Sequence, residues 1–104
     1  MRNAILLLLF LFSSLSSVVF AKVVILDVRT PEEYSKDHVA AAMNIDVKNP
    51  NFKTEVSKLS REDEYKVYCA SGRRSTQAVS IMQELGFKHL ENLGGLENAK
   101  KVLQ

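Results

Sequence analysis

Residues 65–85 read YKVYCASGRRSTQAVSIMQEL, which is a run of strand formers, a short polar loop and an amphipathic segment in direct succession. We expect a strand over residues 65–68 that leads directly to Cys69. Apolar residues at positions 78, 81, 82 and 85 form one stripe, which predicts a helix from about residue 74 to 85. Gly86 follows where a left-handed helix terminator belongs. The only cysteine therefore lies between a predicted strand and a predicted helix.

The chain from residue 22 onward alternates in the same way. Residues 23–28, VVILDV, are a continuous apolar run typical of a strand buried on both faces. Thr30, Pro31 and Glu33 form a capping pattern that predicts a helix over residues 31–37. The remaining expectations are a strand at 42–45, a helix at 52–59 capped by Asn51, a solvated loop at 61–64, a strand at 87–93, a turn at Gly94-Gly95, and a helix at 96–103 with Leu96, Ala99, Val102 and Leu103 inward.

This alternation predicts an α/β fold with a small, mostly parallel sheet flanked by helices and joined by right-handed crossovers. A chain of 104 residues has room for one such domain. In sheets of this kind, ligands bind beyond the carboxyl ends of the strands. Cys69 stands at one of those ends and is the leading candidate for a functional residue.

The first 21 residues have the layout of a cleavable secretory signal peptide. Arg2 precedes an apolar run over residues 4–12, and a serine-rich stretch leads to the small residue Ala21. An uncleaved membrane anchor is the alternative, since residues 4–21 approach the roughly 20 residues of a spanning helix, but four serines weaken it. We expect a signal peptide at 1–21, a mature domain at 22–104, a periplasmic location and no stable membrane association after cleavage.

Charge and composition exclude several partners. The net charge is +2, too weak to indicate a nucleic-acid partner. A single cysteine cannot form an internal disulfide, so a lone thiol in a protein exported to an oxidising compartment suggests a chemical role for that thiol.

Neither His38 nor His89 has a second metal ligand at a useful spacing, so we expect no metal, no other cofactor and structural roles for both histidines. We expect a monomer.

The loop at residues 69–75 carries the residue types that an anionic sulfur needs. A thiolate is favoured by a helix N-terminus, by backbone N–H donors and by guanidinium groups. Gly72 allows the loop to curl so that successive N–H groups point inward. Two arginines add forked donors suited to an anion. We predict Cys69 as the nucleophile and, as substrate-binding residues, Ala70, Ser71, Gly72, Arg73, Arg74 and Ser75.

This loop resembles the active-site loop of the rhodanese family, Cys-x-x-Gly-x-Arg, at Cys69, Gly72 and Arg74. Residues 25–34, ILDVRTPEEY, resemble the family's Asp-Val-Arg-x-x-x-Glu-Tyr signature, residues 38–45, HVAAAMNI, its His-Ile-Pro-Gly-Ala-x-Asn-Ile segment, and residues 93–96, LGGL, its closing Gly-Gly turn. The resemblance covers residues 22–104 and is nearest to the small periplasmic single-domain rhodaneses of the phage shock protein E type. Three of the family's usual Pro and Gly residues are replaced, by Ala40, Ala41 and Asp46, and no Trp follows the Gly-Gly turn.

The resemblance implies a thiosulfate sulfurtransferase. The Cys69 thiolate would attack the outer sulfur of thiosulfate, expel sulfite and become a persulfide, which a nucleophilic acceptor such as cyanide or a thiol would then discharge. Both arginines would attract the dianionic donor, and Arg74, at the family's Arg position, would orient it. Structural roles at the strand-to-helix corners are expected for Asp27, Arg29, Glu33 and His38.

Three other functions are weighed against this one. Cysteine-dependent phosphatases and arsenate reductases have one residue more between Cys and Arg, and Ser75 stands at that position here. Thiol-disulfide exchange lacks a second cysteine to resolve a mixed disulfide. A rhodanese-fold binding module without catalysis remains the alternative.

Overall fold

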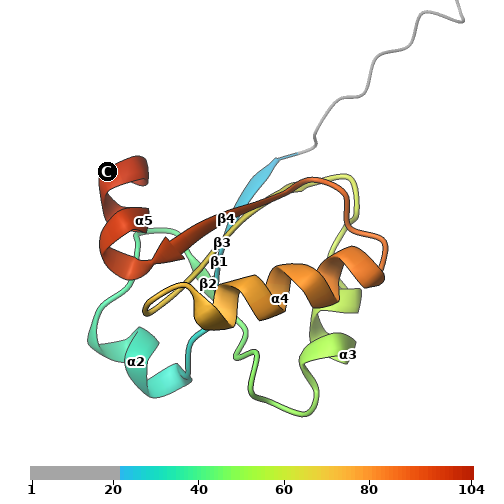
Figure 1. Cartoon of the computed structure of the whole chain (residues 1–104), viewed down its shortest axis with the longest axis horizontal. Coiled ribbons are helices and arrows are strands. Elements are labelled where there is room, and N and C mark those ends of the chain that lie inside the picture. The colour runs from blue at the N-terminus through green and yellow to red at the C-terminus, as the bar shows by residue number, and fades with distance from the viewer. Residues whose placement is uncertain (1–21) are drawn as a thin grey trace, which may run out of the picture.

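The computed structural model describes residues 22–104, and the predicted signal peptide at 1–21 lies outside the described residues (Figure 1). Within this part of the chain, no helix combines the length and apolar character needed to cross a bilayer. The elements in chain order are β1 Val23–Asp27, α2 Pro31–Lys36, β2 Met43–Asn44, α3 Phe52–Ser57, β3 Glu64–Cys69, α4 Arg73–Glu84, β4 Leu90–Gly95 and α5 Leu96–Leu103.

The strands form one parallel sheet in the order β2-β1-β3-β4, which confirms the predicted fold class. Asp27 of β1 pairs with Tyr68 of β3, and Cys69 of β3 pairs with Gly95 of β4. The carboxyl ends of these strands therefore meet at one edge of the sheet. Cys69 is the last residue of β3 and lies at that edge.

Helices cover both faces of the sheet (Figure 1). On one face, α3 and α4 bury an apolar cluster that includes Leu26, Phe52, Val56, Val67, Ala78, Met82 and Phe87. On the other face, the segments around α2 and α5 pack with Val39, Ala42, Tyr68, Leu93 and Ala99. The centre of the sheet is covered on both faces, so Leu26 of β1 and the neighbouring Val67 and Tyr68 of β3 are all fully buried.

Two helix boundaries follow the predicted local signals. Thr30 Oγ1 accepts from the Glu33 amide at 3.2 Å, and a Glu33 carboxylate oxygen accepts from the Thr30 amide at 3.2 Å, so the predicted capping box is present. At the other boundary, α4 ends just before Gly86, whose φ is 96°.

Several shorter-range expectations are wrong. Asn51 stands before α3, but its side chain makes no capping bond, because its φ of −90° and ψ of 9° differ from the extended backbone of an N-cap residue. The Asn51 amide donates to Asn49 Oδ1 at 2.8 Å. Helix α3 ends at Ser57, and β2 spans only two residues. Val102 is 55% exposed, because it lies about 120° around the helix from Leu96, whereas Ala99 and Leu103 share the inward face.

The predicted Gly-Gly turn is also wrong, since Gly94 and Gly95 are the last residues of β4. They pair with Tyr68 and Cys69 after a register shift, and α5 begins directly at Leu96. The strand starts later than predicted, at Leu90, and Phe87 is buried before it. The glycine pair therefore lies against the Cys69 loop and ends the strand there.

Residues 61–64 are not the solvated loop that their charges suggested. Asp63 is 4% exposed, and Glu64 already belongs to β3. Arg61 Nη2 donates to the Leu85 carbonyl at 3.1 Å, and its guanidinium lies 4.4 Å from the centre of the Phe87 ring. These contacts join the start of β3 to the end of α4, so the segment is part of the packed structure.

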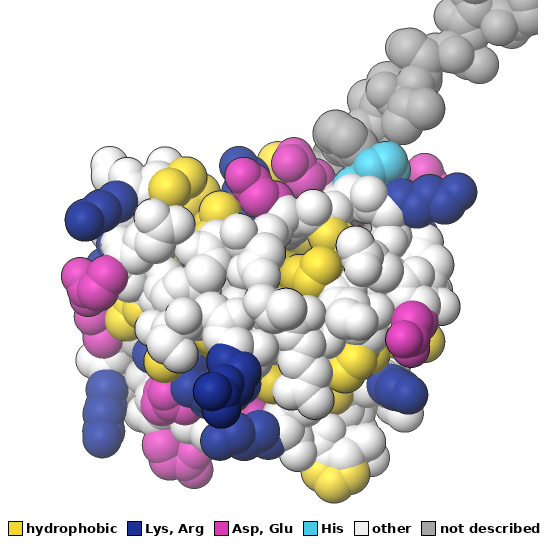
Figure 2. Space-filling model, in the orientation of Figure 1, with side chains coloured by type: hydrophobic (Ala, Val, Ile, Leu, Met, Phe, Trp, Pro, Cys, Tyr) yellow, Lys and Arg dark blue, Asp and Glu magenta, His cyan; other side chains and the backbone are white. Residues whose placement is uncertain are grey.

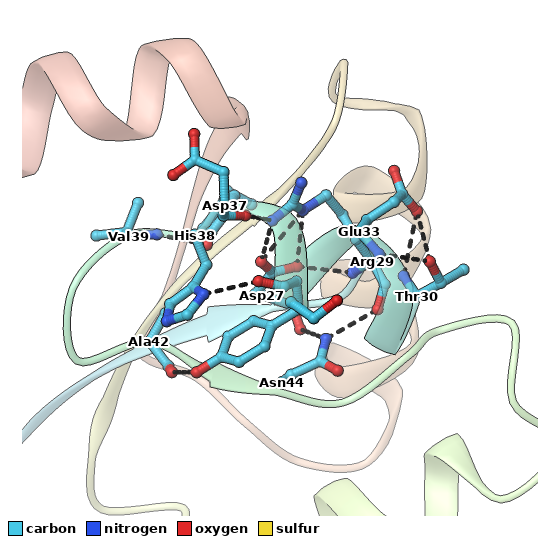
Figure 3. A network of polar contacts seen from close by, with 12 residues as sticks. Asp27, Arg29, Thr30, Glu33, Asp37, His38, Val39, Ala42 and Asn44 are labelled. Carbon is cyan, nitrogen blue, oxygen red and sulfur yellow. Dashed lines mark hydrogen bonds and ion pairs between the residues drawn. The ribbon is translucent and has the colours of Figure 1, made fainter.

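A buried ion pair fixes the carboxyl end of β1 (Figure 3). Arg29 Nη2 donates to Asp27 Oδ2 at 2.7 Å and to the Asp37 carbonyl at 2.6 Å. The Asn44 side chain donates to the carbonyls of Asp27 and Arg29 at 3.0 and 2.8 Å. Arg29 thus ties the end of β1 to the segment after α2, and Asn44 ties it to β2. The hydrogen bond to Asp27 raises the pKa of Arg29.

His38 makes the contacts of a structural histidine. Its Nδ1 lies 2.7 Å from the Tyr34 carbonyl oxygen, and its ring stacks on Tyr34 with the centroids 3.7 Å apart.

We predict that Asp27→Asn lowers the free energy of unfolding by about 3 to 5 kcal/mol, because Arg29 would remain buried without its anionic partner. Urea denaturation at neutral pH measures this loss. Glu91→Gln is the matched control, since it breaks the more exposed Lys66–Glu91 pair and should cost less than about 1 kcal/mol. Equal losses in the two variants would contradict the structural role of the buried pair.

Candidate active site

The Cys69 sulfur lies under a loop that turns its backbone N–H groups inward. Residues 70–72 join β3 to α4, and Gly72 has a φ of 106°, in the left-handed region that residues with a Cβ rarely adopt. This conformation reverses the chain, and the Gly72 amide donates to Cys69 Sγ at 2.9 Å. The curled loop expected from Gly72 is therefore present.

Burial and hydrogen bonding act in opposite directions on the Cys69 thiol. Burial is the largest single effect and raises its pKa. The Ser75 hydroxyl and the amides of Ser75, Gly72 and Ser71 favour the thiolate and together outweigh burial, so the pKa of Cys69 lies below its ordinary value. We refer to these three amides as the amide cradle.

Ser75 is the nearest side-chain partner of the sulfur. Its hydroxyl is fully buried and lies 3.4 Å from Cys69 Sγ, 3.1 Å from the Gly72 carbonyl oxygen and 3.4 Å from the Gly94 carbonyl oxygen. A hydroxyl has one proton to donate. Ser75 can therefore accept from a neutral thiol while donating to a carbonyl, or donate to a thiolate instead.

The sulfur is less open than a surface nucleophile. Cys69 is 1% exposed and borders the apolar cluster that contains Val67 and Ala78. The next two residues, Ala70 and Ser71, are exposed and form the outer part of the loop. The sulfur thus combines an apolar underside with a polar cover of backbone amides.

Strand β4 supports the loop from behind. A Cβ added to Gly95 would lie 2.4 Å from the Ala70 carbonyl oxygen and 3.1 Å from its carbonyl carbon, closer than real Cβ atoms approach. Glycine at this position therefore allows the loop and β4 to touch through their backbones. No local sequence signal distinguished this use of Gly95 from an ordinary turn.

The two arginines of the loop have different environments. Arg74 makes a bidentate ion pair with Glu33 of α2, with N–O distances of 2.7 and 2.9 Å. Arg74 lowers the pKa of Glu33 to about 2. Arg73 is exposed, and none of the ion pairs within residues 22–104 involves it. Figure 2 shows basic side chains gathered where α4 begins, with acidic side chains beside them.

The structure therefore brings Ser71, Gly72 and Ser75 onto the Cys69 sulfur and holds Arg74 at Glu33. The sequence predicted a capping role and a structural role at a strand-to-helix corner for Glu33, but no contact with the Cys69 loop. Its contact with a residue far along the chain has no local signature, so sequence reasoning missed this part of the site.

A cysteine whose pKa is lowered by backbone amides and a hydroxyl, at the carboxyl edge of a parallel sheet, defines an α/β protein suited to anionic sulfur chemistry. The family model described as "Rhodanese-like domain" matches residues 16–101, so the chain belongs to the rhodanese-like family. It is 43% identical over 80 residues to thiosulfate sulfurtransferase PspE of Escherichia coli K12, covering 77% of each chain. This relative is of the type that the sequence resembles.

Other relatives and solved structures agree with the family. YrkF of Bacillus subtilis, whose name describes a sulfur carrier, is 38% identical over 69 residues, which cover 66% of this chain and 36% of YrkF. A structure of a rhodanese with anions from E. coli superposes with a TM-score of 0.62 at 42% identity, over 73% of this chain and 89% of that one. The Rhodanese_3-like domain of the Anabaena protein Alr3790 superposes with a TM-score of 0.69 at 30% identity, over 81% and 93%.

We predict that Cys69 reacts with iodoacetamide with a midpoint pH below that of free cysteine, because the amide cradle and Ser75 favour its thiolate. Ser75→Ala should move this midpoint upward, since burial remains while one donor is lost. The measurement is the alkylation rate against pH, followed by mass spectrometry. Ser80→Ala, at an exposed position of the same helix, should leave the midpoint unchanged. An unchanged midpoint pH in the Ser75→Ala variant would contradict the hydrogen bond between Ser75 and Cys69.

Proposed function

We propose that this protein is a thiosulfate sulfurtransferase that carries sulfur as a persulfide on Cys69. The observation that carries the proposal is the 2.9 Å contact between the Gly72 amide and Cys69 Sγ, with the lowered pKa of the thiol. The rhodanese-like family and the similarity to a chain named as a thiosulfate sulfurtransferase support the choice of reaction.

The proposed reaction has two displacement steps. The Cys69 thiolate attacks the outer sulfur of thiosulfate, a new S–S bond forms, and the S–S bond of the donor breaks with its electron pair leaving on sulfite. The amide cradle then stabilises the negative charge of the persulfide. In the second step a nucleophile, cyanide or a thiol, attacks the outer persulfide sulfur and releases the Cys69 thiolate. Neither step needs an oxidant or a metal.

We assign different roles to the two arginines. Arg73 is exposed beside the loop and would attract the dianionic donor. Arg74 is held by Glu33 and would act as a positioning residue that fixes the first turn of α4 against α2. This assignment leaves donor attraction to Arg73 and replaces the donor-orienting role that the family motif implied for Arg74 with a positioning role. The similar E. coli rhodanese was solved with anions, which supports an anionic ligand here.

We also propose that the chain is exported to the periplasm and cleaved after Ala21, and acts there as a monomer. The charged, apolar and small-residue pattern of positions 2–21 supports this. The first strand begins at Val23, so cleavage would leave every described element intact.

We predict that the reduced protein incubated with thiosulfate gains one sulfur atom on Cys69 and releases sulfite, and that cyanide or a thiol removes the sulfur again. Intact-mass spectrometry with peptide mapping follows the sulfur atom. Cys69→Ser should remain folded and gain nothing, because serine is not ionised at neutral pH. A folded, reduced wild-type protein of unchanged mass would overturn the donor step and favour the non-catalytic binding module.

We predict that Arg73→Ala raises the KM for thiosulfate about fivefold with little change in kcat, since one exposed charge contributes on the order of 1 kcal/mol to attraction. Arg74→Gln should chiefly lower kcat and thermal stability, and Glu33→Gln should reproduce its effect because both variants break the same ion pair. Steady-state kinetics at low and high salt measure these changes. A KM effect confined to Arg74→Gln would reverse the two roles.

A further inference from the structure

A pocket of about 490 Å³ lies at the opposite end of the strands from Cys69. Its walls come from the start of β1, the end of α3 and the start of β3. Apolar side chains dominate the lining, among them Val23, Ile25 and Leu59. One acidic side chain, Asp63, also lines the pocket.

Asp63 is the only buried polar side chain within residues 22–104 that has an atom without a hydrogen-bond partner. The residue is 4% exposed, and its Oδ1 is buried and unpartnered. A buried carboxylate is strongly destabilised unless a cation or a donor meets it. The pocket therefore has a place for a positive charge beside Asp63.

The backbone register brings the start of the mature chain to this carboxylate. The Lys22 carbonyl accepts from the Glu64 amide at 3.0 Å, and Val23 pairs with Glu64. In a parallel ladder, the amide and the carbonyl of one residue face the same neighbouring strand. The Lys22 nitrogen therefore faces the β3 side, where Asp63 immediately precedes Glu64, and both residues line the pocket.

We infer that the α-ammonium group of Lys22, released by cleavage after Ala21, binds the buried Asp63 carboxylate. Hydrolysis of the peptide bond between residues 21 and 22 consumes one water and yields the Ala21 carboxylate and the Lys22 amine, which is protonated at neutral pH. In the uncleaved chain the same nitrogen is an uncharged amide. Processing thus supplies a cation beside a carboxylate oxygen that has no partner in the fold, and stabilises the mature domain. The inference rests on the proposed export, not on the sulfur chemistry.

Other charged and titratable residues lie near this site. Lys22, Lys58 and Tyr65 also line the pocket, Glu62 and Glu64 flank Asp63 along the chain, and Lys58 is paired with Glu55 at 3.2 Å. Burial and then the Asp63 charge raise the pKa of the Tyr65 hydroxyl, whereas the Arg61 charge lowers it. An α-ammonium paired with Asp63 should titrate above the ordinary range of about 7.7 to 8.0. The stability it adds is then present below that range and is lost as pH rises through the elevated pKa.

The test uses the full 104-residue chain, exported by a Gram-negative host and purified after processing. Mass spectrometry should show Lys22 at the N-terminus. Reductive methylation with ¹³C-formaldehyde then reports the α-amine titration by NMR. We expect a pKa about one unit above the ordinary α-amine value. Asp63→Asn should return it to the ordinary value and lower the Tm of the mature protein.

A second variant allows the inference to be tested if Asp63→Asn fails to fold. A mature protein that retains Ala21, released from a tag by a site-specific protease, keeps Asp63 but moves the ammonium by one residue, and its α-amine should titrate normally. Three results would overturn the inference: an ordinary pKa in the protein that begins at Lys22, an elevated pKa that persists in both variants, or an N-terminus at another residue. Sulfur loading of Cys69 should be unaffected throughout, so failure here is distinct from failure of the proposed activity.

Discussion

The contact between the Gly72 amide and Cys69 Sγ requires a backbone conformation that residues with a Cβ rarely adopt. Burial raises the pKa of Cys69, and the Ser75 hydroxyl and the amides of Ser75, Gly72 and Ser71 lower it, so this loop geometry supplies part of what favours the thiolate. The groups that favour the Cys69 thiolate are therefore backbone amides and one hydroxyl, not charged side chains. Together they lower the pKa of a sulfur that is almost completely buried.

The loop keeps this geometry because three parts of the fold hold it. Ser75 bonds to the Gly72 carbonyl from inside, β4 meets the Ala70 carbonyl through Gly95, and Glu33 holds Arg74 at the first turn of α4. Each support comes from a different element of the structure. The sheet order places all of them at one edge, so the site and the fold are specified together.

The sequence predicts features that depend on neighbours along the chain. The β3 strand, the loop, the α4 stripe and the α2 capping box all have local signatures, and each is present. The features it misses depend on distant partners. The Arg74–Glu33 pair, the backbone contact of Gly95 and the burial of Asp63 arise only when β-strands and helices far apart in sequence meet. Charged residues such as Asp63 are usually exposed, so the run of charged residues at 61–64 predicted a solvated loop.

The near-complete burial of Cys69 also acts as a steric filter. A disulfide between two copies of this chain would need two sulfur atoms to meet at about 2 Å, and a sulfur that is 1% exposed offers almost no surface for such an approach. The burial that opposes ionisation of Cys69 therefore also opposes cross-linking through it.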